Sequence, residues 1–318
     1  KYRRGYMKKI GVVFPGQGSQ KVGMGKKLYE NFDYIKSIYK KADEVLGFSI
    51  TELCFNGPED ELRKTFNTQP ALLLTSYAIW NVLKEKTDIK PAFVAGHSLG
   101  EWTALLVSGF FTFQEALMLT RKRGLFMEEA CPKGKGGMVA LIGPDMDKVI
   151  PVLEEISRDD YVCVPANLNA HDQVVLSGDI NALKEAVERL KGVGYKKAVF
   201  LNVSGPFHSP LMKAAADRLN EELNNIQAKE LQIPVISNVD AEPTYDKEKI
   251  KDKLFRQMFS PVLWEDSVKR MVKEGVEVFL EVGPQRVLTN LIKRIAPDVS
   301  CIGIEELEDI ESIRGVIA

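Results

Sequence analysis

The 318-residue sequence has little net charge, no long apolar run and few histidines, and each scarcity narrows the possible functions. Its formal net charge is −1, so the chain as a whole shows no sign of a nucleic-acid or membrane-surface partner. No apolar run approaches the roughly 18 residues of a membrane span. We therefore expect a globular protein with no nucleic-acid partner and no membrane segment.

The spacing of the cysteines does not fit a metal site. All four are scattered without C-x-x-C or cysteine–histidine spacing, at Cys54, Cys131, Cys163 and Cys301. This pattern argues against a structural metal and for a reduced, cytoplasmic compartment. We also interpret the six residues before Met7 as a leader or tag remnant and leave them out of the fold prediction.

What the sequence does contain is a G-x-S-x-G pentapeptide at residues 96–100. The apolar run 92–95 predicts a short buried strand before it, and 101–108 predicts a helix closed by Gly109. A serine on so sharp a strand-to-helix turn projects its hydroxyl clear of the backbone. Ser98 is therefore the candidate nucleophile. The alternative is a glycine-bounded turn with a capping serine.

Serine chemistry of this kind needs a base, and the chain has only three histidines. His97 is adjacent to Ser98, and its side chain should diverge from the serine on the elbow. His171 is predicted in a polar turn between two strands. His208 lies between two prolines that stiffen its backbone, so we favour His208 as general base.

Two further segments carry polar residues of interest. The strand 10–14 runs into a glycine-rich loop at 15–20 that lacks the Lys-Ser/Thr of a P-loop, so it either brings Gln17 toward a site at the sheet edge or is a plain tight turn. In the predicted helix 112–127, Arg121 and Arg123 flank a lysine. Successive helical residues splay apart, so only one or two of these cations can face inward, and periodicity does not choose among them.

The order of the predicted elements indicates an α/β fold. Residues 134–203 give a βαββαβ pattern typical of a ferredoxin-like subdomain. Strands and helices interleave elsewhere, including helices at 27–46 and 71–85 and a strand at 233–238. We expect a large α/β-hydrolase-like domain, residues 7–133 and 202–318, with the ferredoxin-like subdomain, residues 134–201, inserted in it.

Several motifs in one order resemble the malonyl-CoA:acyl carrier protein transacylases of bacterial-type fatty acid synthesis, over essentially residues 7–304. The segments that carry this resemblance are 15–20, 96–101, 123–127, Asn167, 205–208, 237–238, Gln257 and 281–284. The loop 169–172 departs from the proline- and glycine-containing turn of the family, which leaves His171 without an implied role.

The resemblance implies a ping-pong transfer with malonyl-CoA and phosphopantetheinylated acyl carrier protein as substrates and with no cofactor. Ser98 would carry the malonyl group and His208 would move its proton. The resemblance assigns the other roles as follows: the backbone amides of Gln17 and Leu99 form the oxyanion hole, Arg123 pairs with the malonyl carboxylate, Phe207 selects malonyl over branched units, Asn167 lines the site, and Gln257 orients the histidine through a main-chain carbonyl. We expect a monomer.

Three other functions compete with this one. The first is an acyltransferase for acetyl or a branched unit. The second is a serine hydrolase or thioesterase, although an α/β-hydrolase places its histidine near the end of the chain, whereas about a hundred residues follow His208. The third is a docking module for acyl carrier protein whose catalytic site has decayed.

Overall fold

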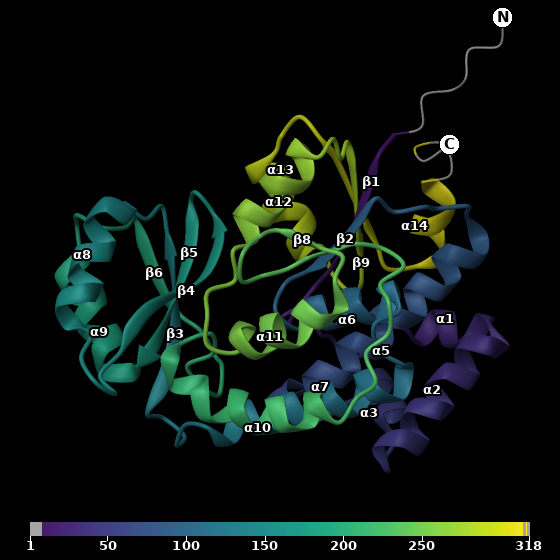
Figure 1. Cartoon of the computed structure of the whole chain (residues 1–318), viewed down its shortest axis with the longest axis horizontal. Helices are drawn as coiled ribbons and strands as arrows, with labels where there is room; N and C mark the ends of the chain where they lie inside the picture. The colour runs from purple at the N-terminus through teal and green to yellow at the C-terminus, as the bar shows by residue number, and fades with distance from the viewer. Residues whose placement is uncertain (1–7, 314–315, 317–318) are drawn as a thin grey trace, which may run out of the picture.

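The computed structural model describes residues 8–313 and 316, and Met7 and the six residues before it lie outside this part. Two separate sheets organise the described residues (Figure 1). One has six strands and the other has four. The predicted α/β class, with a second sheet of βαββαβ order, is confirmed.

The six-stranded sheet is parallel except at one edge. Its spatial order is β10-β9-β1-β2-β7-β8, with β8 antiparallel to β7. Its strands are β1 (Ile10–Phe14), β2 (Phe93–Gly96), β7 (Val235–Ile236), β8 (Pro243–Thr244), β9 (Val278–Val282) and β10 (Ser300–Ile304). The carboxyl ends of β1 and β2 therefore lie side by side, which is where an open α/β sheet binds its ligands.

Helices cover both faces of this sheet. Val12 and Phe14 of β1 pack into one apolar cluster and Val13 into another, because successive side chains of a strand point to opposite faces. Helices α5 (Thr65–Lys86), α6 (Leu99–Ser108) and α7 (Phe113–Glu129) contribute to the first cluster, and α12 (Trp264–Lys273) and α13 (Val287–Ile295) to the second. The remaining helices outside the second sheet are α1 (Lys26–Asn31), α2 (Asp33–Leu46), α3 (Ile50–Asn56), α4 (Glu59–Arg63), the 3-10 helix η1 (Pro210–Met212), α10 (Lys213–Asn224), α11 (Lys247–Gln257) and α14 (Leu307–Ser312).

The four-stranded sheet is antiparallel, in the order β4-β5-β3-β6, and α8 and α9 pack beside it (Figure 1). Its elements are β3 (Gly136–Ile142), α8 (Met146–Ile156), β4 (Cys163–Ala170), β5 (Gln173–Asp179), α9 (Ile180–Leu190) and β6 (Lys197–Phe200). Val262, just before α12, donates its N–H to the Ala166 carbonyl (2.8 Å) and accepts from the Leu168 N–H (3.0 Å). These bonds fix β4 beside the segment that leads into α12.

The structure corrects three expected boundaries. The single helix expected at 27–46 is interrupted by the extended backbone of Phe32, which separates α1 from α2. The strand expected at 233–238 is only the two residues of β7. The helix expected to begin after Pro70 begins at Thr65, so the proline lies inside α5.

A side chain from α7 explains why α5 tolerates its proline. Pro70 has no N–H to give to the carbonyl of Phe66, four residues earlier in the helix. Arg121 donates its Nη1 to that carbonyl at 2.9 Å, which replaces the missing hydrogen bond. In the described part of the chain, no helix has the length and apolar character needed to cross a bilayer.

Candidate active site

The site is built on the turn between β2 and α6. Ser98 has φ 52° and ψ −106°, a strained conformation for a residue with a side chain. Its neighbours are packed so closely that only glycine fits. A Cβ on Gly96 would lie 1.9 Å from the Gly100 carbonyl carbon, and one on Gly100 would lie 2.0 Å from the Phe14 carbonyl oxygen. The end of β1 and the start of α6 thus hold the serine in its strained turn.

His208, in the segment between β6 and η1, lies beside this serine. Its Nε2 lies 2.7 Å from Ser98 Oγ, and its Nδ1 lies 2.8 Å from the main-chain carbonyl oxygen of Gln257. A carbonyl only accepts hydrogen bonds, so Nδ1 carries the proton and Nε2 presents a lone pair to the serine hydroxyl. Burial, and after it the positive charge of Arg123, lower the pKa of His208 to about 3. The imidazole is therefore neutral and ready to accept a proton.

Arg123 lies beside the same hydroxyl and is 1% exposed. Its Nη2 donates to Ser98 Oγ at 3.1 Å and to Gln257 Oε1 at 3.1 Å, and its Nη1 donates to Gln69 Oε1 at 2.8 Å. The Trp102 ring lies 5.8 Å from the guanidinium carbon. Among the described residues all these hydrogen-bond acceptors are neutral, and Nε has no partner. Because a buried cation without a paired anion is costly, this guanidinium is suited to an anionic ligand.

A cavity of about 100 Å³ opens in front of the serine. The residues predicted to bind substrate or oxyanion all line it: Gln17, Leu99, Arg123, Asn167 and Phe207. Leu99 is the first residue of α6, where backbone N–H groups have no acceptor within the helix and the helix dipole favours negative charge. Gln257 does not line this cavity. Its side chain instead contacts two residues that do, Arg123 and the main-chain carbonyl of Ser98.

The other two histidines take no part in the serine contact. His97 turns away, as predicted, and its Nε2 lies 2.8 Å from Asn169 Oδ1. His171 is exposed in the turn between β4 and β5. Gln69 of α5 is buried, and its Oε1 accepts from Arg123.

The sequence analysis gave no role to two residues behind the nucleophile, Asn238 and Glu101, although both lie in segments that carry the family resemblance. Asn238 Oδ1 accepts the Ser98 N–H at 2.8 Å, and Asn238 Nδ2 donates to the Gly96 carbonyl at 2.7 Å. Glu101, which is 2% exposed, accepts from Gln257 Nε2 at 2.7 Å. A carboxylate in the first turn of a mainly apolar helix was the signal that could have identified Glu101.

Comparison with known proteins places this site in a family. The model of the acyl transferase domain matches residues 12–309. The malonyl CoA-acyl carrier protein transacylase of Bacillus subtilis (strain 168) is 44% identical over 305 residues, covering 96% of each chain, and that of Staphylococcus aureus (strain MRSA252) is 41% identical, covering 96% of this chain and 98% of its own.

Solved structures agree with these relatives. An acyl carrier protein S-malonyltransferase from Vibrio cholerae has a TM-score of 0.93 at 41% identity, covering 96% of this chain and all of that one. A type II PKS acyl-carrier protein in complex with its malonyl-transacylase contains a chain with a TM-score of 0.92 at 40% identity, covering 96% of this chain and 98% of that one. The chain thus belongs to the acyl transferase family and, within it, to the malonyl CoA-acyl carrier protein transacylases.

Proposed function

We propose that the protein transfers a malonyl group from malonyl-CoA to the phosphopantetheine thiol of acyl carrier protein, through a malonyl ester on Ser98. In the first half-reaction the serine oxygen attacks the thioester carbonyl while His208 Nε2 takes the hydroxyl proton. The tetrahedral intermediate collapses as the carbon–sulfur bond breaks. His208 then returns the proton to the coenzyme A thiolate, which leaves as the free thiol.

The second half-reaction reverses these roles. His208 takes the proton of the pantetheine thiol, and the thiolate attacks the malonyl ester. The carbon–oxygen bond breaks, and the serine oxygen regains its proton. In both halves the backbone amides of Leu99 and Gln17 are the proposed donors to the developing oxyanion, a kind of stabilisation that typically contributes several kcal/mol.

The observation that carries the choice of malonyl is Arg123. A thioester carbonyl placed at Ser98 Oγ puts the far carboxylate of a malonyl group next to a buried guanidinium that forms no direct ion pair with any of the described residues. An Arg–carboxylate pair gives both charge and a fixed two-point geometry. Acetyl-CoA has no carboxylate to offer, so the site should bind it less well. The small cavity also suits a short acyl group.

The test is a mass measurement on the intact protein. Mixing with malonyl-CoA should add one malonyl group, the Ser98→Ala variant should gain none, and holo-acyl carrier protein should remove the group from the wild-type enzyme. Rapid release of free malonate that the carrier does not suppress would favour a serine hydrolase. Full activity of Ser98→Ala would refute the covalent route.

We propose that residues 7–133 and 202–318 form the catalytic domain, with 134–201 as its ferredoxin-like subdomain. We also propose a monomer that acts in the cytoplasm on its two substrates without a cofactor. The cytoplasmic location is supported by the four cysteines, which are all buried and unpaired.

A further inference from the structure

Behind Ser98 lies a buried carboxylate that the proposed transfer steps do not use. Glu101 Oε2 accepts from Gln257 Nε2 at 2.7 Å and from the Asn238 N–H at 3.1 Å. Burial outweighs the lowering effect of these hydrogen bonds and of the positive charge of Lys253, so the pKa of Glu101 is raised to about 7. The negative charge of the carboxylate is therefore stabilised by these hydrogen bonds and by Lys253, and not by solvent.

The position of this carboxylate decides how the Gln257 amide is oriented. An ionised carboxylate only accepts hydrogen bonds, so the amide nitrogen must face Glu101. The same nitrogen then also donates to the Ser98 carbonyl at 3.0 Å and to Asn238 Oδ1 at 3.2 Å. The amide oxygen is left facing the other way, where it accepts from Arg123 Nη2 at 3.1 Å and from Trp102 Nε1 at 3.1 Å.

We propose that Glu101 is a positioning residue for malonyl transfer: its charged carboxylate holds the Gln257 amide in the orientation that presents an oxygen, and not an N–H₂ group, to Arg123. The proposal rests on the proposed function, because it matters only if Arg123 binds the malonyl carboxylate. Reversing the amide would place donor against donor at Arg123. It would displace the guanidinium from the reacting centre while leaving the Gln257 main-chain carbonyl on His208.

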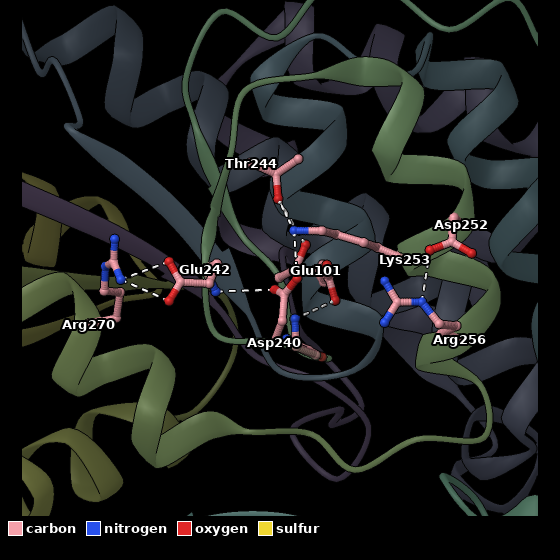
Figure 2. Close-up of polar contacts among 10 residues, drawn as sticks. Glu101, Asp240, Glu242, Thr244, Asp252, Lys253, Arg256 and Arg270 are labelled. Atoms are coloured by element: carbon pink, nitrogen blue, oxygen red, sulfur yellow. Dashed lines mark hydrogen bonds and ion pairs between the residues drawn. The ribbon is translucent and has the colours of Figure 1, made fainter.

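Lys253 of α11 is the second part of this arrangement. Its side chain is buried, and its Nζ donates to Thr244 Oγ1 at 2.5 Å and pairs with Asp240 Oδ2 at 2.9 Å. In Figure 2 the Lys253 amine contacts Thr244 of β8 and Asp240 of the loop that links β7 and β8, and Glu101 is drawn with them. The charged groups that face Glu101 are Lys253 from α11 and Arg123 from α7. Farther out, Asp240 also accepts from the Glu242 N–H at 3.2 Å.

The direct test is Glu101→Gln, which keeps the shape and removes the charge. A neutral amide at position 101 can offer its own N–H₂ group to Gln257, so the charged contact that favours this orientation is lost and only the contacts to Arg123, Trp102 and the Ser98 carbonyl still hold it. We expect the ratio of kcat/KM for malonyl-CoA to that for acetyl-CoA to fall roughly tenfold, mainly through a higher KM for malonyl-CoA, which corresponds to the loss of about one hydrogen bond to a charged group.

The matched control is Glu281→Gln. Glu281 is also fully buried, and its carboxylate accepts from the Leu288 and Thr289 N–H groups at the start of α13, none of which lines the cavity at Ser98. A purely structural loss should lower its melting temperature without changing the malonyl-to-acetyl ratio. If Glu101→Gln behaves in the same way as this control, the positioning role is wrong.

A second variant keeps the proposal testable if Glu101→Gln does not fold. Lys253→Met removes the nearby positive charge, so Glu101 should take up a proton at higher pH than in the wild type. Since activity needs the ionised carboxylate, the acid limb of the malonyl rate profile should move up by roughly one pH unit. The control is Lys249→Met. Lys249 is exposed and lies one turn earlier on α11, so this variant should have the same pH profile as the wild type.

The outcomes separate this proposal from the proposed function. If the wild-type enzyme forms no malonyl ester on Ser98, the proposed function fails. If the wild type forms the ester, but Lys253→Met has the wild-type profile or folded Glu101→Gln has the wild-type selectivity, only the positioning role is overturned. A lower malonyl-to-acetyl ratio together with a shifted acid limb supports it.

Discussion

Replacing Arg123 by alanine should convert a malonyl-selective enzyme into an unselective one. Removing one partner of a buried, hydrogen-bonded charge pair costs about 2–5 kcal/mol. With acetyl-CoA the variant loses only the hydrogen bond from Nη2 to Ser98 Oγ, and a bond with one charged partner contributes about 1.5–3 kcal/mol. The central values differ by about 1.3 kcal/mol, which is roughly an eightfold fall in the malonyl-to-acetyl ratio of kcat/KM.

The assay follows transfer of each acyl group to holo-acyl carrier protein, with the two coenzyme A thioesters in competition. Arg121→Ala is the matched control, because Arg121 lies on the same helix and donates to the Phe66 carbonyl of α5 rather than to a cavity residue. The control should lose stability by about 1–3 kcal/mol, the cost of an unsatisfied buried carbonyl, and keep its selectivity. Equal losses for malonyl and acetyl in Arg123→Ala would refute the carboxylate-binding role.

Two further predictions concern the residues on either side of the 207–208 peptide bond. Phe207→Ser should enlarge the cavity and raise the methylmalonyl-to-malonyl ratio of kcat/KM about tenfold, the usual value of one methyl-sized difference in an apolar pocket, and an unchanged ratio in competition assays would contradict its selecting role. His208 binds its proton more weakly in the folded protein than in the unfolded chain, so the stability it contributes is present above about pH 6.5 and is lost as the pH falls toward 3. Relative to His208→Gln, which does not titrate, the wild type should lose about 2 kcal/mol of unfolding free energy between pH 6.5 and 5 by urea denaturation, and parallel curves would contradict the lowered pKa.

The sequence analysis worked best where a local pattern has one structural solution. The pentapeptide at 96–100 predicted the strained turn because only glycines allow β2 and α6 to approach so closely. The βαββαβ order of the predicted segments likewise predicted the second sheet, since this order is typical of a ferredoxin-like arrangement. Element ends were less accurate, because they depend on partners elsewhere in the chain. Phe32 interrupts a helix although no proline or glycine marks the break.

Pro70 shows how a tertiary contact overrides a sound local rule. The residue before a proline disfavours the helical conformation, and an internal proline leaves a carbonyl unpaired. Both rules predicted a helix start after residue 70. The rule fails here because Arg121, from another helix, supplies the missing donor. Nothing in residues 65–86 reveals that donor.

The same contact between α5 and α7 explains why periodicity could not choose among the three consecutive cations of α7. A Cβ on Gly124 would lie 2.6 Å from the Phe66 Cα, so the two helices touch at this glycine. Around that contact Arg121 turns toward the Phe66 carbonyl and Arg123 toward Ser98, while Lys122 points outward and pairs with Glu222. A glycine inside a helical pattern is a sign of close approach. Gly124 was therefore the local evidence for where α7 meets its partner, but only the fold could show that the partner carries Gln69 and faces the nucleophile.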